Sequence, residues 1–302
     1  MDECGRYRHG VTGNRSPDVS VVILTMGNRP AQLRAAVDSA LRQDGVKVEV
    51  VVVANGAPAE LGIPADKRVQ VVVSRDNLGI PGGRNLGAAA AGATVIAFLD
   101  DDARLSGPGT LTASVRALAA EPHLGVVALR IVDEDGGTAR RHVPRIGARS
   151  AERSGPATAF LGGAAVIRRA AFERVGGYAG DFHYAMEETD LALRLVDDGW
   201  TIRYDSTPAV IHPLTDPSRH AEATTRTMRN RVWLAYRNLP APLAVVYVAN
   251  WLVISALRRP HQLIELLGAI RDGWRTRPAG QRAPIRWGTV VQLTRLGRPP
   301  IV

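Results

Sequence analysis

Three consecutive acidic residues after an apolar run are the feature of this sequence that most clearly indicates chemistry. Asp100, Asp101 and Asp102 follow the segment VIAFL at 95–99. Adjacent carboxylates repel one another and raise one another's pKa unless a cation lies among them, and Mg²⁺ or Mn²⁺ prefers oxygen ligands. If strand geometry continues, Asp100 and Asp102 point to one side and Asp101 points elsewhere. A solvated Asp-rich loop or helix N-cap is the alternative, but the position at the end of a strand favours a metal site.

A second acidic group precedes an apolar helical pattern. Glu187, Glu188 and Asp190 stand at the start of a predicted helix whose interior is formed by apolar residues over 191–196. The helix dipole favours acids at this end, which explains at least one of them without any function. In the functional interpretation, one carboxylate is a general base that removes a proton from an acceptor hydroxyl. Two adjacent glutamates also tend to raise one another's pKa.

The first two thirds of the chain predict an α/β domain with a doubly wound, mostly parallel sheet. Apolar, β-branched runs at 19–25, 48–53, 69–73 and 95–99 indicate strands buried on both faces. Helical stretches at 30–42 and 81–91 alternate with them. Ligands of such sheets bind beyond the carboxyl ends of the strands, where the loops 25–29 and 55–56 and the Asp cluster all fall.

Charge divides the 302 residues unevenly. From Arg219 onward there are 14 arginines against three acidic residues, although the net charge of the whole chain is only +9. We therefore expect a polar tail at 1–17, a near-neutral α/β domain at 18–215 and a basic helical extension at 216–302. The single cysteine, Cys4, excludes an internal disulfide framework, and the first ten residues lack the apolar core of a secretory signal. Both observations fit a cytoplasmic protein.

The basic extension contains an uncharged apolar stretch, LPAPLAVVYVANWLVISAL at 239–257, flanked by arginines. Three interpretations compete: a buried or oligomer-forming helix, a membrane-spanning helix, and a helix lying on the membrane surface. Prolines in the first turn and Asn250 in the middle disfavour a span. We therefore expect peripheral contact with the inner face of the cell membrane. Arginines would meet anionic head groups, with four tryptophans as interfacial anchors: Trp233, Trp251, Trp274 and Trp287.

Taken together, the motifs of residues 18–215 resemble the family 2 glycosyltransferases, which have the GT-A fold. The resemblance rests on six segments in order: VSVVILTMGNRP (19–30), NLGIPGGRNLGAA (77–89), FLDDDA (98–103), FLGGAAVIRRAAFERVGGY (160–178), MEETDLALRL (186–195) and AVIH (209–212). Each segment alone is a weak signal, but the ordered set is specific. The resemblance implies an inverting transfer of a sugar from a nucleotide-diphospho-sugar to a hydroxyl of a glycan or lipid-linked acceptor.

The resemblance also assigns roles to individual residues. It implies that Asp100, Asp102 and His212 bind Mn²⁺ or Mg²⁺, with Asp102 the most direct ligand, and that Glu188, beside Glu187, is the catalytic base. The expected nucleotide and donor-binding positions are Thr25, Asn28, Arg29, Asn55, Asn77, Gly79, Arg84, Asn85, Asp100, Asp101, Gly162 and Gly163. Gly82 and Gly83 would let the backbone approach the ligand closely.

Two positions depart from the family pattern, and they leave the nucleotide and the catalytic base open. Ala54 stands where relatives often have an Asp that contacts the base, so the nucleotide could be UDP-, dTDP- or GDP-linked. The base position holds Glu rather than the commoner Asp, which leaves Glu187 and Glu188 both open. The acceptor and the oligomeric state are not encoded in any pattern, and a homo-oligomer is compatible with the sequence.

Two rival functions compete with that of a transferase. A sugar-phosphate nucleotidyltransferase would carry a Gly-rich, basic signature after the first strand, whereas this loop reads MGNRP. A non-catalytic nucleotide-binding scaffold would not need the intact acids at 100–102 and 187–188. The arginines of the extension are interleaved with apolar residues and carry no nucleic-acid-binding motif, so we expect no nucleic-acid partner.

Overall fold

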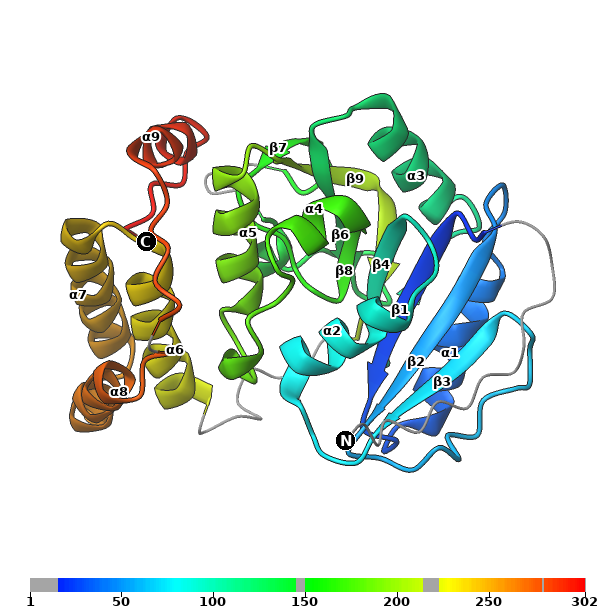
Figure 1. Cartoon of the computed structure of the whole chain (residues 1–302), viewed down its shortest axis with the longest axis horizontal. Coiled ribbons are helices and arrows are strands. Elements are labelled where there is room, and N and C mark those ends of the chain that lie inside the picture. Colours follow the sequence, from blue (N-terminus) through cyan, green and yellow to red (C-terminus); the bar gives the residue numbers. More distant parts are fainter. Residues whose placement is uncertain (1–15, 145–149, 214–222, 279, 302) are drawn as a thin grey trace.

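The computed structural model describes residues 16–144, 150–213, 223–278 and 280–301. Cys4 and most of the predicted polar tail lie outside these residues, as does the predicted boundary near 216. Figure 1 shows a twisted sheet flanked by helices, with a separate layer of helices at the C-terminal end. The strands are β1 Val19–Thr25, β2 Val48–Asn55, β3 Val69–Ser74, β4 Val95–Asp100, β5 Arg104–Leu105, β6 Leu124–Val132, β7 Gly155–Ala157, β8 Ala164–Arg168 and β9 Thr201–Ile211. The helices are α1 Pro30–Leu41, α2 Gly79–Ala90, α3 Thr110–Ala120, α4 Arg169–Arg174, α5 Glu187–Asp197, α6 Ala223–Asn238, α7 Ala241–Arg258, α8 Leu263–Arg275 and α9 Trp287–Arg295.

The sheet has the order β3-β2-β1-β4-β8-β6-β9-β5, with β7 paired to β9. Strands β3, β2, β1 and β4 are parallel neighbours, as the four apolar runs predicted. Strand β8 is antiparallel to β4 and β6, while β6 and β9 are parallel to each other. The sheet is therefore mixed but mostly parallel. Thr25, Asn55 and Asp100 end β1, β2 and β4, so these polar residues gather at one edge of the sheet.

Two hydrophobic cores cover the two faces of the sheet. On one face, α1 buries Leu33, Ala36, Val37 and Ala40, which recur at helical spacing after a first-turn proline. On the other face, α2 packs so closely that a side-chain carbon at Gly83 would lie 2.2 Å from a methyl of Leu24. The prediction that Gly83 serves a close approach to the ligand is therefore wrong, because this glycine instead lets α2 lie against β1.

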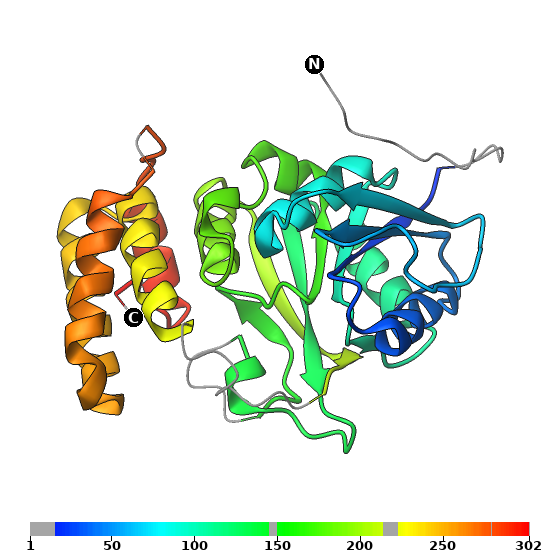
Figure 2. The same ribbon diagram turned by 90° about the horizontal axis from the view of Figure 1, so that it is seen from below.

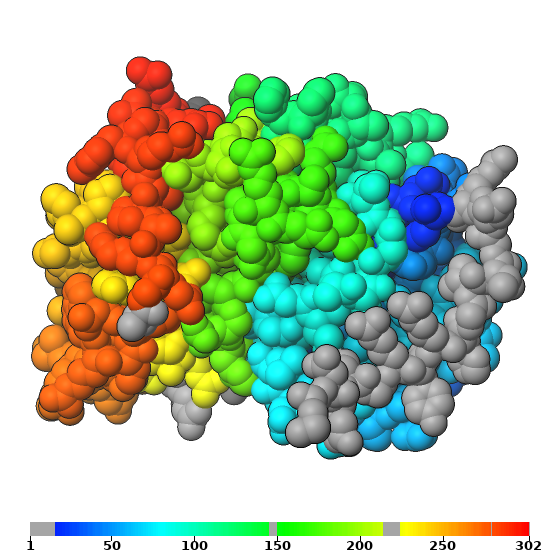
Figure 3. Space-filling view, viewed as in Figure 1, coloured from blue at the N-terminus to red at the C-terminus, as the bar shows by residue number. Residues whose placement is uncertain are grey.

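The second core continues without a break into the C-terminal helices. Side chains of α5 such as Leu191 and Leu195 belong to the same buried cluster as Trp233, Leu234 and Tyr247 of α6 and α7. Figure 2 shows these helices, yellow to red, standing as a layer beside the green α5, and Figure 3 shows their surfaces in direct contact with it. The extension is thus packed onto the helix that carries the second acidic group.

Helix α7 coincides with the predicted apolar stretch, and its prolines occupy the first turn rather than the interior. Within the described residues, α7 is the single helix whose length and mean hydropathy of 1.5 would permit a membrane span, and length and composition do not require one. Trp233 is buried against the ring of Phe182 and donates to the carbonyl of Gly273, so it cannot be an interfacial anchor as predicted. Trp274 and Trp287 are exposed.

Candidate active site

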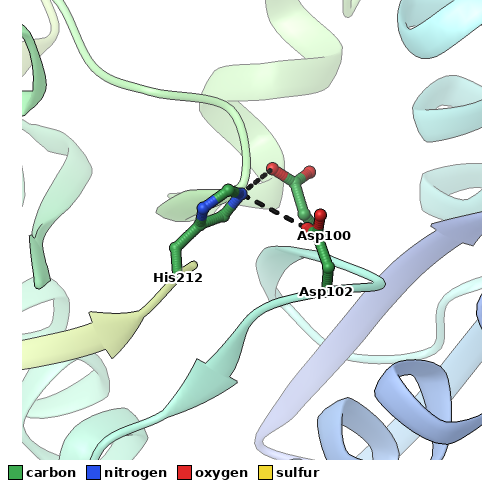
Figure 4. A group of neighbouring side chains, drawn as sticks. All are labelled: Asp100, Asp102 and His212. Carbon is green, nitrogen blue, oxygen red and sulfur yellow. Dashed lines mark ion pairs between the residues drawn. The ribbon is translucent and has the colours of Figure 1, made fainter. Parts of the chain in front are cut away.

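The three aspartates at the end of β4 diverge, as strand geometry predicted. Asp101 turns inward and is buried, where its carboxylate accepts a hydrogen bond of 2.7 Å from Thr25 Oγ1. Asp100 and Asp102 point together toward His212, which follows β9 (Figure 4). Burial raises the pKa of Asp101, although the Thr25 hydrogen bond and the Arg29 charge act in the opposite direction. Asp101 therefore joins the two strand-end loops rather than the carboxylate pair.

Asp100, Asp102 and His212 form a group that could hold a metal ion. Their ligand atoms all lie within 4.8 Å of one another. The Nε2 atom of His212 is 3.3 Å from Asp102 and 4.0 Å from Asp100. On the other side of the ring, Nδ1 is 2.8 Å from the carbonyl oxygen of Pro213. When Nδ1 donates to this carbonyl, the Nε2 lone pair faces the carboxylates, as a metal-binding histidine requires. Two carboxylates and one imidazole therefore fit Mn²⁺ or Mg²⁺.

The electrostatics of this group match a place built for a cation. The hydrogen bond with Asp102 raises the pKa of His212 against the opposing effect of burial. Burial alone would raise the pKa of Asp102, but the hydrogen bond and charge of His212, together with Arg29, lower it. Arg29 forms an ion pair with Asp102 and lies 3.4 Å from Asp101. Positive charge is thus supplied to these carboxylates from two sides.

Arg84 links the first acidic group to the second. Its guanidinium is almost fully buried and donates to Asp100 at 2.9 Å and to Glu188 at 3.1 Å. Burial works against its charge, but Asp100 and other neighbouring acidic groups outweigh this and raise the pKa of Arg84. The resemblance placed Arg84 in the nucleotide-binding segment. In the structure it lies between the metal-binding group and the expected base.

Gly162 and Gly163 lie against these same charged groups. A side-chain carbon at Gly162 would fall 1.9 Å from an Arg84 nitrogen and 2.5 Å from a Glu188 oxygen. At Gly163 it would fall 2.0 Å from an oxygen of Asp100. The absence of side chains at these two positions therefore allows the carboxylates and Arg84 to meet.

The structure separates the two glutamates that the sequence left open. The side chain of Glu188 is 23% exposed, whereas Glu187 is only 2% exposed. Burial, followed by the charge of Glu188, raises the pKa of Glu187 to about 8. One carboxyl oxygen of Glu187 has no hydrogen-bond partner among the described residues. Glu187 is therefore a buried, mainly neutral acid at pH 7, while Glu188 faces the site.

The asparagines predicted to bind the donor have mixed positions. Asn28 is exposed at the mouth of the loop after β1. Asn55 is buried, and its amide group bonds to Asn77, to the carbonyl of Gly79 and to the amide nitrogen of Leu78. These bonds fix the start of α2 against the end of β2. They also occupy the amide of Asn55, the residue next to Ala54.

Asn85 and Gly79 likewise serve the local backbone. The side chain of Asn85 both donates to and accepts from the backbone of Tyr178, at 2.8 and 2.9 Å. Gly79 has a positive φ of 70°, and a side-chain carbon there would lie 2.4 Å from the carbonyl oxygen of His183. Both residues thus hold α2 against the segment that leads to α5.

Sequence reasoning missed the side chains of α6 that surround α5. Asp190 is fully buried and accepts hydrogen bonds from Arg237 at 3.0 Å and from Asn238 at 2.7 Å. Asn230, two turns earlier on the same face of α6, bonds to the backbone just before α5. Polar residues in a predicted basic helix are expected to face solvent. The one signal of a buried polar face was the helical spacing of Asn230, Arg237 and Asn238.

Comparison with known proteins supports a single family. The sequence profile of glycosyl transferase family 2 matches residues 20–176. The chain is 37% identical over 132 residues to the succinoglycan biosynthesis protein ExoO of Rhizobium meliloti (strain 1021). This match covers 42% of the chain and 37% of ExoO, so the chain spans little more than a third of that relative.

Two solved structures share this architecture. TarS 1–349 of S. aureus superposes with a TM-score of 0.60 at 15% identity, covering 86% of this chain and 81% of TarS 1–349. The mannosyltransferase PcManGT of Pyrobaculum calidifontis, solved with GDP-Man and Mn²⁺, superposes with a TM-score of 0.57 at 19% identity over 93% and 80% of the two chains. These likenesses confirm the expected GT-A fold. Because the family profile covers more than half of the sequence, the chain belongs to glycosyl transferase family 2.

Proposed function

We propose that this glycosyltransferase moves a sugar from a nucleotide-diphospho-sugar to a hydroxyl acceptor with inversion at the anomeric carbon. The observation that carries the proposal is the pair of acidic groups joined by Arg84. Asp100 of the metal-binding group and Glu188 both bind this one guanidinium, so the place for a departing diphosphate and the place for a base are adjacent. A single in-line displacement needs these two functions on opposite sides of the reacting carbon.

In this reaction Glu188 accepts the proton of the acceptor hydroxyl. Arg84 binds its carboxylate, and the absence of a side chain at Gly162 leaves room for it. The neighbouring Glu187 is buried and has a raised pKa, so it adds little negative charge beside the base. Asp102, His212 and Asp100 would hold the divalent ion, which would supply neutralising charge for the departing diphosphate. Because imidazole suits transition metals better than it suits Mg²⁺, we propose that Mn²⁺ binds here more tightly than Mg²⁺.

The donor nucleotide is proposed to lie along the loops after β1 and β2. Asn28 and Met26 are exposed there, and Asn77 lies beside Met26. Asn55 is committed to the backbone of α2, so the base would be read by backbone groups or by the exposed side chains of the first loop. Donors linked to UDP, dTDP or GDP remain in the proposal, and the relatives solved with UDP-GlcNAc and GDP-Man include two of these nucleotides.

Calorimetric titration with UDP, GDP and dTDP, each with and without Mn²⁺, tests this function. One nucleotide should bind only when Mn²⁺ is present, and Asp102→Ala should abolish that binding. The matched control is Asp66→Ala, which removes a carboxylate paired only with its neighbour Arg68 on the surface. Folded wild-type protein that binds none of the three nucleotides would contradict the proposal.

We also propose that the acceptor is a glycan or lipid-linked sugar met at the inner face of the cell membrane. The relative ExoO is named for succinoglycan biosynthesis, a polysaccharide process. Helices α7 and α8 expose large apolar side chains, including Leu257 at 79% and Ile264 at 85%. Exposed arginines at 258, 271 and 275 lie on the same two helices, and the exposed Arg259 directly follows α7. Exposed apolar side chains accompanied by arginines on the same helices fit an anionic lipid surface.

Sedimentation with vesicles tests the membrane contact. Wild-type protein should bind vesicles that contain phosphatidylglycerol and bind neutral vesicles much less. Leu257→Glu and Ile264→Glu should weaken this binding, because both side chains are exposed and their loss leaves the core intact. A truncation after residue 219 is a poor test, since it would uncover the core that α6 shares with α5. A dimer that dissociates in Ile264→Glu, with no vesicle binding in the wild type, would assign this face to a second copy of the chain.

A further inference from the structure

The segment that leads into α5 has an unusual backbone. His183, Ala185 and Met186 have positive φ angles of 59°, 69° and 76°, and these are the non-glycine residues with positive φ in the described chain. Side chains other than glycine adopt this region only where surrounding contacts hold them there. Met186 is the residue directly before the first turn of α5. The direction in which α5 begins, and therefore the position of Glu188, depends on this strained segment.

One side chain of the C-terminal extension holds the segment. The amide nitrogen of Asn230, on α6, donates to the carbonyl oxygens of Phe182 at 3.0 Å, Tyr184 at 2.7 Å and Ala185 at 2.9 Å. Asn230 is fully buried. Its own oxygen accepts from the guanidinium of Arg229, which stacks over the ring of Trp233. Three carbonyl acceptors require the nitrogen on this side, so the orientation of the amide is fixed.

The neighbouring carbonyls of the segment are bound by other elements. The carbonyl of His183 accepts from the amide nitrogen of Ile80 at 2.8 Å, and that of Met186 accepts from Asp190 within α5. The carbonyls of Tyr184 and Ala185 both accept hydrogen bonds from Asn230. Without this amide, two partly buried carbonyl groups in a strained loop would each lose a hydrogen bond, and such a loss costs stability.

We propose that Asn230 is a positioning residue that sets the geometry of Glu188 by clamping the segment 183–186. The C-terminal extension is in this way part of the transfer machinery rather than only a means of attachment. The inference rests on the proposed role of Glu188 as base. Asn230 touches neither donor nor acceptor in this arrangement, so its effect belongs to turnover and not to nucleotide binding.

Hydrogen–deuterium exchange of the full chain tests the clamp without any substrate. In Asn230→Ala, amides of the segment 183–190 should exchange faster than in the wild type, while those of β4 keep their protection. The matched control is Thr289→Val, which removes another buried bond between the extension and α5, from Thr289 Oγ1 to Asp197 at the far end of the helix. Unchanged exchange over 183–190 in Asn230→Ala would overturn the proposal.

Steady-state kinetics distinguish a positioning role from a merely structural one, because only the former lowers kcat while KM stays unchanged. With UDP-glucose, UDP-N-acetylglucosamine or GDP-mannose, whichever the wild type consumes, kcat of Asn230→Ala should fall by about 10- to 100-fold, as expected for a displaced catalytic group. The KM for the donor and the Mn²⁺-dependent binding of the nucleotide should stay as in the wild type. Asn230→Ser, which keeps one short donor, should give an intermediate kcat and serves if the alanine variant does not fold. An equal loss of kcat in Thr289→Val would refute a specific role.

A rescue variant sharpens the test. Ala185→Gly relieves the positive φ at that position, so the double variant Asn230→Ala/Ala185→Gly should recover part of the lost kcat. No recovery would count against the clamp. Glu188→Gln separates this inference from the proposed function. If Glu188→Gln turns over like the wild type, the base is misassigned, and hydrogen exchange over 183–190 alone decides whether Asn230 holds the segment.

Discussion

The two acidic groups of the active site are held in place by different parts of the chain. Asp100 ends a central strand and Asp102 lies in the turn after it, and their partners Arg29, Arg84 and His212 all come from the sheet domain. Glu188 begins a helix whose approach is clamped by Asn230. A second buried carboxylate of that helix, Asp190, is bound by further side chains of α6.

This difference assigns two tasks to two regions. The carboxyl end of a buried parallel sheet is rigid, and it fixes the residues that would hold a metal and a diphosphate. The proposed base is placed by the C-terminal helices, which also carry the exposed apolar side chains and arginines. Contact of those helices with an acceptor surface would then act on the base and not on donor binding. Substitutions on the two sides should accordingly affect different kinetic constants.

The largest effect is expected at the base itself. Glu188→Gln should lower kcat by about 10²- to 10⁴-fold, because the amide cannot accept the proton of the acceptor hydroxyl. Binding of the nucleotide with Mn²⁺, measured by calorimetry, should remain close to the wild type. Glu187→Gln is the matched control, since it makes the same change one residue earlier and replaces an acid that is already mainly neutral. A reversed pattern would make Glu187 the base.

Substitutions at the adjacent glycines 162 and 163 should disturb the base and the metal-binding carboxylates separately. In Gly163→Ala the added carbon would displace Asp100, and we expect Mn²⁺-dependent nucleotide binding to weaken by about ten-fold or more, as for other disturbed metal ligands. In Gly162→Ala it would displace Arg84 and Glu188, which should lower kcat by a similar factor while metal binding changes less.

Gly107→Ala is the control for this pair, because a side-chain carbon there meets nothing within 4 Å. Calorimetry with Mn²⁺ and the nucleotide, followed by steady-state kinetics, measures both effects. If Gly162→Ala and Gly163→Ala lower kcat and nucleotide affinity to the same extent, the two regions do not have separate tasks.

The donor side of the site could be read from the sequence because its signals are local. A run of β-branched residues predicts β4, and alternation along the strand separates Asp101 from Asp100 and Asp102. His212 follows β9, the strand that pairs with β6 and β5, and its approach to Asp102 was available only through the family resemblance. Sequence separation of more than a hundred residues leaves no local pattern to connect them.

The base side could be predicted only in part. The apolar spacing predicted helix α5. The positive φ angles of Ala185 and Met186 just before it could not be predicted, because neither position is a glycine. Asn230 and Trp233 lie in an arginine-rich segment that reads as a solvated surface. Both are buried because α6 packs on α5, and that packing is a property of the tertiary fold. Gly83 was misread for a similar reason, since its close neighbour is Leu24 of β1 and not a ligand.

The last expected effect concerns how the stability of the base side changes with pH. The pKa of Glu187 is raised to about 8 in the folded protein, mainly by burial, whereas an exposed glutamate titrates near 4.5. Between these two values the unfolded chain has released this proton while the folded chain retains it. The free energy of unfolding should therefore fall as pH rises through this window, by at most roughly 1.4 kcal/mol per pH unit, and level off above about 8.

Urea unfolding at pH 6 and pH 8.5 measures this dependence. Glu187→Gln should flatten the decline, because the amide is neutral at both pH values and fits the same space. Glu60→Gln, at an exposed position, should leave the decline as in the wild type. A wild-type slope in Glu187→Gln would mean that the buried acid is ionised in the folded protein, with its charge balanced by Arg84. In that case Arg84 would neutralise both glutamates. The position of Glu188 would then depend on the sheet domain more than the Asn230 clamp implies.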